Sequence, residues 1–132
     1  MKILVVDDEA DVQPLFVQRF RKEVRTGEVE LAFALSGEEA YTYIEQHPFE
    51  VVLILSDINM PGMSGLELLR LLREKYAVAP PVIMMITAYS DAENYQQAMQ
   101  YGADDFLTKP LDFPKLKDKL KVLTFDGKDT GG

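Results

Sequence analysis

Short runs of apolar, mostly β-branched residues alternate along this chain with longer segments of helical periodicity. A continuous apolar run is typical of a strand that is buried on both faces of a parallel sheet. Alternation of such strands with crossover helices indicates an α/β fold with a five-stranded, doubly wound parallel sheet. The strands are expected near residues 2–6, 29–34, 51–56, 81–86 and 104–108.

Apolar residues recur at helical spacing in each segment between or after the expected strands. Right-handed crossovers would place these helices on both faces of the sheet, so that every strand ends at the same edge. The apolar helical faces are Val12, Leu15, Phe16 and Phe20; Ala40, Tyr43, Ile44 and His47; Leu66, Leu69 and Leu72; Tyr95, Ala98 and Met99; and Phe113, Leu116, Leu120 and Leu123.

The length and charge of the chain limit its organisation and its partners. Its 132 residues fit one domain, expected over residues 1–124, and the polar, Gly-rich stretch 125–132 is expected to be a flexible tail or the start of a linker. A net charge of −8 argues against direct binding to nucleic acid or to an anionic membrane, and favours proteins and cations as partners. The absence of cysteine and of a signal or membrane-spanning segment leads us to expect a cytoplasmic protein.

Polar side chains follow four of the five expected strands. Asp7 and Asp8 come after the first strand, Asp57 after the third, Thr87 after the fourth and Lys109 after the fifth. Taken singly, each has an ordinary explanation as a turn, a helix cap or a surface residue. Because parallel strands end at one edge of the sheet, these side chains are expected to converge there.

Three carboxylates at one edge need compensating charge. Two carboxylates about 4 Å apart repel each other by about 4 kcal/mol at an effective dielectric constant of about 20, so a cation, protons or Lys109 must offset them. Oxygen ligands suit Mg²⁺, which binds a few protein groups together with a phosphate. The pattern therefore predicts phosphoryl transfer with Asp57 as nucleophile. Lys109 would neutralise one phosphoryl oxygen, and the Thr87 hydroxyl would donate a hydrogen bond to another.

Four short motifs together give the chain a family resemblance. They are Asp7-Asp8, Asp57 with Asn59-Met60-Pro61-Gly62 after it, Thr87-Ala88 and Lys109-Pro110. On these residues the chain resembles the receiver domain of response regulators in two-component systems, similar to the single-domain chemotaxis regulator. The resemblance covers nearly the whole chain and implies a flavodoxin-like fold.

The resemblance implies a phosphorylation-activated switch that is not an enzyme beyond its own phosphorylation and dephosphorylation. Asp57 would take a phosphoryl group from a phosphohistidine of a sensor histidine kinase or a histidine phosphotransfer protein. Mg²⁺, with Mn²⁺ as the alternative metal, would be held by Asp8 and Asp57 and by the backbone carbonyl of Asn59. Asp7 would act through water or by orienting Lys109. The Lys109–Pro110 peptide bond would be cis.

Thr87 and Phe106 are the residues that the resemblance implies as the switch. In receivers the threonine moves toward the phosphoryl group, and an aromatic side chain three residues before the lysine turns inward. Many relatives have tyrosine at the position of Phe106, and a tyrosine hydroxyl favours the solvated, outward rotamer. We therefore expect a weaker aromatic switch here. Asn59 and Tyr89 are expected to flank the path of water to the acyl phosphate.

The last helix has a concentration of positive charge in Lys115, Lys117, Lys119 and Lys121. The simplest interpretation is that these lysines form a solvent-exposed face of the helix. In receivers, however, the surface of the fourth and fifth helices contacts effectors or a second copy, so a homodimer there and a fused or separate effector are the alternatives.

Three rival interpretations involve particular residues. A phosphoaspartyl phosphatase would need a second acid two positions after Asp57, where this chain has Asn59. A flavin-binding module would need a glycine- and hydroxyl-rich loop after the first strand, where Asp7-Asp8-Glu9 would repel a phosphate. A scaffold-type receiver that is never phosphorylated stays an alternative. For His47, at an expected helix end, the simplest explanation is a favourable contact with the helix dipole.

Overall fold

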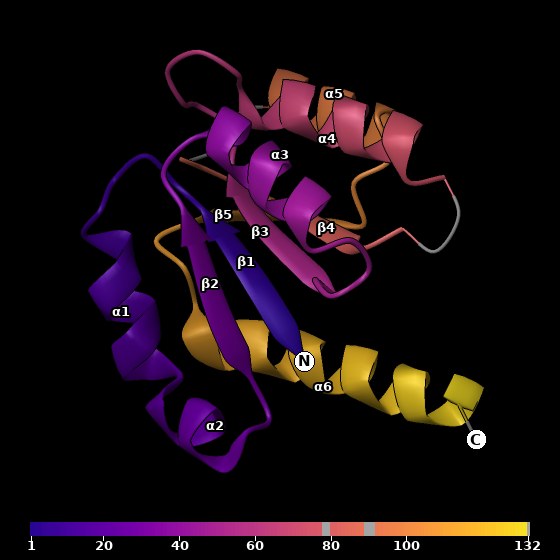
Figure 1. Cartoon of the computed structure of the whole chain (residues 1–132). Coiled ribbons are helices and arrows are strands. Elements are labelled where there is room, and N and C mark those ends of the chain that lie inside the picture. The colour runs from indigo at the N-terminus through magenta and orange to yellow at the C-terminus, as the bar shows by residue number, and fades with distance from the viewer. Residues whose placement is uncertain (78–79, 89–91, 132) are drawn as a thin grey trace.

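A single parallel sheet of five strands forms the centre of the computed structural model, which describes residues 1–77, 80–88 and 92–131. The strand order is β2-β1-β3-β4-β5, so β1, β3 and β4 have a neighbour on each side and β2 and β5 form the edges of the sheet (Figure 1). The strands are β1 Lys2–Val6, β2 Glu30–Ala34, β3 Leu53–Asp57, β4 Val82–Ala88 and β5 Asp105–Lys109.

Helices cover both faces of the sheet (Figure 1). One buried apolar cluster joins α3, α4 and α5 to one face, and a second joins α1 and α6 to the other. The prediction of a doubly wound five-stranded parallel sheet is confirmed. The helices are α1 Val12–Arg19, α2 Arg21–Thr26, α3 Gly37–Gln46, α4 Gly65–Lys75, α5 Ala92–Gln100 and α6 Phe113–Gly131.

The first crossover differs from the prediction, because it contains two helices instead of one. The helix breaks at Phe20, whose φ of −104° and ψ of 16° lie outside the helical region. The ring of Phe20 nevertheless stays buried, stacked on Phe16 at 6.0 Å between ring centroids and edge-on to Phe113 at 6.2 Å. The four-residue spacing from Phe16 to Phe20 is that of a helix, so periodicity alone conceals the break.

The C-terminal helix is longer than the sequence suggests. The backbone of α6 is helical as far as Gly131, across most of the stretch 125–132 that was expected to be a tail. Adding residues to an existing helix costs little compared with starting one, so a polar, Gly-containing segment can continue it. The domain boundary at residue 124 stays a prediction. None of the helices in the described part of the chain has the length and apolar character needed to cross a membrane.

Candidate functional site

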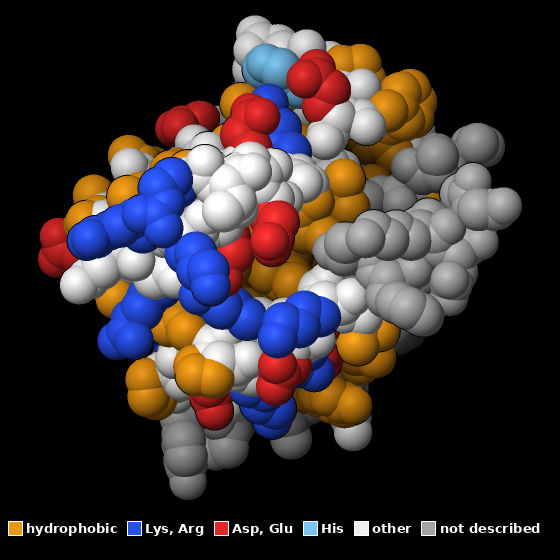
Figure 2. All heavy atoms as spheres, turned by 90° about the horizontal axis from the view of Figure 1, so that it is seen from below, with side chains coloured by type: hydrophobic (Ala, Val, Ile, Leu, Met, Phe, Trp, Pro, Cys, Tyr) orange, Lys and Arg blue, Asp and Glu red, His pale blue; other side chains and the backbone are white. Residues whose placement is uncertain are grey.

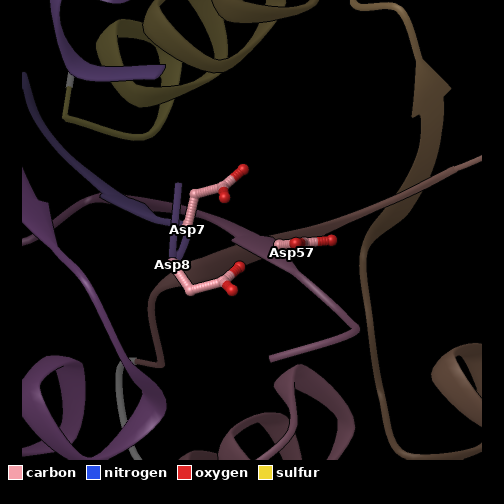
Figure 3. A group of neighbouring side chains, drawn as sticks. All are labelled: Asp7, Asp8 and Asp57. Carbon is pink, nitrogen blue, oxygen red and sulfur yellow. The ribbon is translucent and has the colours of Figure 1, made fainter. Parts of the chain in front are cut away.

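Two neighbouring inner strands, β1 and β3, position the acidic residues of the site. Asp7 directly follows β1, and Asp57 is the last residue of the neighbouring β3. Both side chains are buried, with 7% and 6% of their residue surface exposed, whereas Asp8 is exposed. One carboxylate oxygen from each of the three lies within 4.8 Å of the others, and Figure 3 shows the three carboxylates beside one another at the strand ends.

Lys109 supplies the positive charge, from the last position of the edge strand β5. Its Nζ donates a hydrogen bond of 3.3 Å to Oδ2 of Asp7 and lies 3.6 Å from Oδ2 of Asp57. The second oxygen of Asp7, Oδ1, accepts a hydrogen bond of 2.9 Å from the backbone N–H of Glu9. The Lys109–Pro110 peptide bond is cis, in agreement with the expectation. Lys109 therefore bridges the two buried carboxylates.

The electrostatic state of the site follows from this arrangement. Burial raises the pKa of Asp57; Lys109 opposes that change, while the charge of Asp7 adds to it, and the pKa of Asp57 lies above its ordinary value. Burial alone would lower the pKa of Lys109, but the charges of Asp57 and Asp7 outweigh it and raise this pKa. One ammonium group thus faces two carboxylates at neutral pH, with a third beside them, and the cluster has an excess of negative charge.

The backbone around Asp57 is fixed by contacts with α4 and β4. The N–H of Ile58 donates to the carbonyl of Ile86 in β4 at 3.0 Å, and the carbonyl of Ile58 accepts from the N–H of Gly65 at 2.8 Å. The hydroxyl of Ser56 donates to the carbonyl of Asp57 at 3.0 Å. Asp57 is therefore held at the end of its strand by backbone contacts on both sides.

Gly65 allows this close approach. A Cβ atom at Gly65 would lie 2.1 Å from the carbonyl oxygen of Asp57, which is far inside van der Waals contact. Sequence reasoning missed both Gly65 and Ser56. A signal for Gly65 was present, because glycine is an unfavourable residue within a helix, and its place just after the cap residue Ser64 points to a close backbone contact.

The remaining predicted site residues lie near the same edge. Thr87 is fully buried in β4, beside Thr108 of β5 in the sheet register. Phe106 is half-buried in β5, with its ring edge-on to Tyr95 of α5 at 5.2 Å between centroids. Asn59 is exposed in the loop that follows β3. Tyr89, expected at the path of water, lies outside the described residues.

The carboxylate cluster fits a hard divalent cation. Its ligand atoms are all oxygens, they are close enough to share one ion, and they have more negative charge than Lys109 offsets. Mg²⁺ prefers such oxygen ligands and retains several waters, for which the exposed side of Asp8 leaves room. The residues present are therefore compatible with Mg²⁺.

A groove opens next to the site, between α1 and the segment that joins β5 to α6. Its volume is about 570 Å³, and Asp7, Glu9 and Lys109 line one part of it. Its other walls are mainly apolar, with Leu15 and Phe113 among them. A partner that lies in this groove would reach the carboxylate cluster directly.

A sheet of this order with an acidic pair, a buried aspartate and a lysine at its carboxyl edge defines a class of signalling domain. Residues 3–121 match the family model described as the response regulator receiver domain, and the chain belongs to this family. Among curated proteins, it is 33% identical over 123 residues to response regulator RppA of Synechocystis, covering 93% of this chain and 50% of that protein. It is 34% identical to the two-component response regulator PhoP of Pseudomonas aeruginosa over 93% of this chain and 51% of that protein.

Solved structures of receiver domains have the same fold. The chain is 28% identical to a receiver domain protein from Methanospirillum hungatei, with a TM-score of 0.81 over 99% of this chain and 98% of that one. The receiver domain of a LuxO repressor protein from Vibrio parahaemolyticus is 25% identical, with a TM-score of 0.83, covering 98% and 94% of the two chains. By contrast, the chain spans about half of the length of RppA and PhoP.

Proposed function

We propose that this receiver domain accepts a phosphoryl group on Asp57 from a phosphohistidine of a sensor histidine kinase or histidine phosphotransfer protein. The observation that carries the proposal is the convergence of Lys109 on two buried carboxylates, Asp7 and Asp57, at the ends of the inner strands. A lone buried ion pair would need one acid. A second buried acid, with Asp8 beside it, leaves negative charge that suits a divalent cation, and the cation would in turn offset the charge of a phosphoryl group.

The proposed reaction is an in-line displacement at phosphorus. A carboxylate oxygen of Asp57 forms a new O–P bond as the N–P bond of the phosphohistidine breaks, and the bonding electrons return to the imidazole nitrogen. Asp57 must be ionised to attack, and Lys109 at 3.6 Å favours that form. The Lys109 ammonium is proposed to neutralise developing charge on one phosphoryl oxygen, and the Thr87 hydroxyl to donate a hydrogen bond to another.

The proposed metal ligands are Asp8 and Asp57, with the backbone carbonyl of Asn59 and with Asp7 through water. Bound there, Mg²⁺ or Mn²⁺ would offset the charge of the incoming phosphoryl group. The protein's own contribution is to hold these oxygens in place, through the hydrogen bond from Glu9 to Asp7 and the contact of Gly65 with the Asp57 backbone.

Phosphorylation is proposed to change a protein-interaction surface through Thr87 and Phe106. A phosphoryl group adds about −1.5 to −2 charges and new hydrogen-bond acceptors. Phe106 lies against Tyr95 of α5, so a movement of its ring reaches the exposed face of α5. Thr87 is buried in β4, the strand that pairs with the strand of Phe106. Effectors, fused or separate, and a homodimer through this face are the proposed outputs.

Two of the α6 lysines are engaged with other elements of the molecule, whereas Lys121 is paired, within the described residues, only with Asp118 of its own helix, at 4.0 Å. Lys117 donates to the carbonyl of Arg19 at 2.7 Å and pairs with Glu23 at 3.1 Å, and Lys119 pairs with Asp105 of β5. Charge reversal at Lys117 would therefore disturb the packing of α6 on α1. Lys115 and Lys121 are exposed and are the better probes of partner docking.

The proposal is tested by the intact mass of the protein after incubation with Mg²⁺ and acetyl phosphate, a small-molecule phosphodonor, with rapid quenching. We expect one phosphoryl adduct, which is lost in the Asp57→Asn variant and after chelation of the metal. Asp118→Asn, which removes an exposed carboxylate on α6, is the matched control and should be phosphorylated normally. If the folded protein forms no adduct, the scaffold-type receiver becomes the better account.

A further inference from the structure

The loop of residues 58–64 connects Asp57 at the end of β3 to the first turn of α4. It includes Asn59, whose backbone carbonyl is a proposed metal ligand. The base of the loop is closed by the hydrogen bond from the N–H of Gly65 to the carbonyl of Ile58, and Met60 is buried in the core. The position of Asn59 therefore depends on what holds the remaining part of the loop.

Glu38, in the first turn of α3, contacts that remaining part. Its Oε2 accepts a hydrogen bond of 3.2 Å from the backbone N–H of Met63, between residues 25 apart in the sequence. The hydroxyl of Ser36 accepts from the N–H of Glu39 at 3.0 Å, which caps α3 and fixes the turn that carries Glu38. Figure 1 shows the loop beside the N-terminal end of α3. The Glu38–Met63 hydrogen bond thus attaches the loop to a second helix.

Two glycines allow the loop and α3 to approach so closely. Gly62 has a φ of 73°, which glycine adopts without strain, and a Cβ atom there would be 2.6 Å from Oε2 of Glu38. On the other side of the contact, a Cβ atom at Gly37 would be 2.9 Å from the carbonyl oxygen of Met63. The two backbones therefore fit closely around the Glu38–Met63 hydrogen bond.

We propose that Glu38 is a positioning residue for the metal site, because it holds the loop in the conformation that presents the Asn59 carbonyl to the ion. This inference rests on the proposed function, in which the carboxylate cluster binds a cation. Without the Glu38–Met63 hydrogen bond, the loop would spend part of its time in other conformations. The apparent dissociation constant for Mg²⁺ would then rise as the competent fraction falls.

The charge of Glu38 must be separated from its hydrogen bond, because any carboxylate near the site attracts a cation. Glu38→Gln removes the charge but keeps an oxygen that can accept from Met63. Glu39 is exposed in the same helical turn, so Glu39→Gln removes an equal charge and leaves the hydrogen bond in place.

A third control removes a charge far from the loop. Asp118→Asn lies on α6, which packs on the opposite face of the sheet from α3. Figure 2 views the molecule from the end where α6 lies and shows acidic side chains among basic ones. The variant therefore lowers the negative charge of the whole protein without a change near Asn59.

Two measurements on these variants test the proposal. Hydrogen exchange of the Met63 amide, followed by NMR in the metal-free protein, reports the hydrogen bond without any ion. A titration with Mg²⁺, followed by the amide signals of Asp57 and Ile58, gives the dissociation constant. Glu38 is exposed, so its variants should fold. We expect Glu38→Ala to raise both the exchange rate and the dissociation constant by about fivefold, as the loss of one ordinary hydrogen bond predicts. The other three variants should stay within about twofold of the wild type, since a neutral acceptor still makes the bond.

Gly62→Ala provides an independent check through a double-mutant cycle. Its Cβ would displace the Glu38 carboxylate, so it should weaken Mg²⁺ binding in the wild type. In the Glu38→Ala background only the strain of alanine at a positive φ remains, and the effect should be smaller. Equal effects in the two backgrounds would show that Gly62 does not act through Glu38 and would count against the proposal.

The remaining outcomes distinguish this inference from the proposed function. Unchanged Met63 exchange in Glu38→Ala overturns the inference, whether or not the protein binds Mg²⁺. Faster exchange with an unchanged dissociation constant overturns the positioning role but leaves the proposed function intact. Equal weakening of Mg²⁺ binding in Glu38→Gln and Glu39→Gln would assign the effect to charge and also overturn it. A wild type that does not bind Mg²⁺ refutes the proposed metal site itself, and the positioning role with it.

Discussion

The ionised form of Asp57 is disfavoured in the folded protein. The residue is 6% exposed, and burial raises its pKa above the ordinary value of 3.8, although Lys109 opposes the change. Between 3.8 and the raised pKa, the folded state binds a proton that the unfolded chain has lost. The contribution of Asp57 to the free energy of unfolding therefore falls as the pH rises through this window, and it is lowest above it.

The Asp57→Asn variant should accordingly be more stable than the wild type at pH 7 in metal-free buffer. We expect a gain in the free energy of unfolding, because the folded variant no longer holds an ionised carboxylate in this buried position. The gain should shrink as the pH is lowered toward 3.8 and disappear well below it, where the wild-type carboxyl is protonated in both states. Urea unfolding at a series of pH values measures it. A gain in stability that does not change with pH would show that the difference does not come from the ionisation of Asp57.

Phe106 lies half-buried against Tyr95 and the core, without a hydroxyl to solvate. We expect its side-chain rotamer to change less on addition of beryllofluoride, a phosphoryl mimic, than the rotamer of the tyrosine in a Phe106→Tyr variant. NMR of the aromatic side chains with and without the mimic measures this difference. Equal rotamer changes in the two proteins would show that the hydroxyl is irrelevant to the switch.

At the scale of elements, α4 connects the proposed phosphoacceptor, Asp57, to the opposite end of the sheet. Its first residue, Gly65, contacts the backbone of Asp57. Near its other end, Arg73 donates to the carbonyls of Gly102 and Pro81 and pairs with Asp104 at 2.8 Å. A helix fixed at both ends transmits a displacement along its axis, so α4 is positioned to respond to changes at Asp57.

Gly65→Ala should therefore destabilise the protein, although alanine is the better helix former by about 1 kcal/mol. The added Cβ would be 2.1 Å from the Asp57 carbonyl oxygen and 2.9 Å from Cα of Ile58, so α4 must move away. We expect a loss of about 2 kcal/mol or more in the free energy of unfolding, and slower phosphorylation by acetyl phosphate. Glu74→Ala, at an exposed position of the same helix, should change both by little. A neutral or stabilising Gly65→Ala would refute the contact.

The sequence predicts the elements better than their boundaries. The apolar runs place all five strands to within about two residues, because continuous hydrophobicity is a strong signal for buried parallel strands. The break at Phe20 is not predictable in this way, since it leaves the helical spacing unchanged. The extension of α6 to Gly131 is not predictable either, since that polar stretch has no apolar periodicity. The convergence of Asp7, Asp57 and Lys109 follows from topology alone. Their contacts with Ser56 and Gly65 depend on backbone geometry that residue patterns do not contain.

At the scale of the whole molecule, the proposed metal site should couple cation binding to stability. A ligand that binds only the folded state stabilises it, by about 2.7 kcal/mol at a free concentration one hundred times its dissociation constant. We expect Mg²⁺ to raise the melting temperature of the wild type, and to raise that of Asp8→Asn much less, because Asp8 would be a direct ligand. Thermal unfolding with and without chelator measures the shift.

Asp118→Asn keeps the carboxylate cluster and loses one exposed charge elsewhere, so it should show the full shift of the wild type. Equal shifts in all three proteins would mean that Mg²⁺ acts on the overall charge of −8 and not at the cluster.

The position of the acidic residues on the inner strands has a consequence for how the site opens. Amide hydrogens of inner strands exchange only when the molecule unfolds as a whole, whereas edge strands open through smaller fluctuations. Asp7 follows β1 and Asp57 ends β3, both inner strands, but Lys109 ends the edge strand β5. Local opening of the edge strand β5 would therefore move Lys109 away from the site first. The two buried carboxylates would stay together until the whole molecule unfolds.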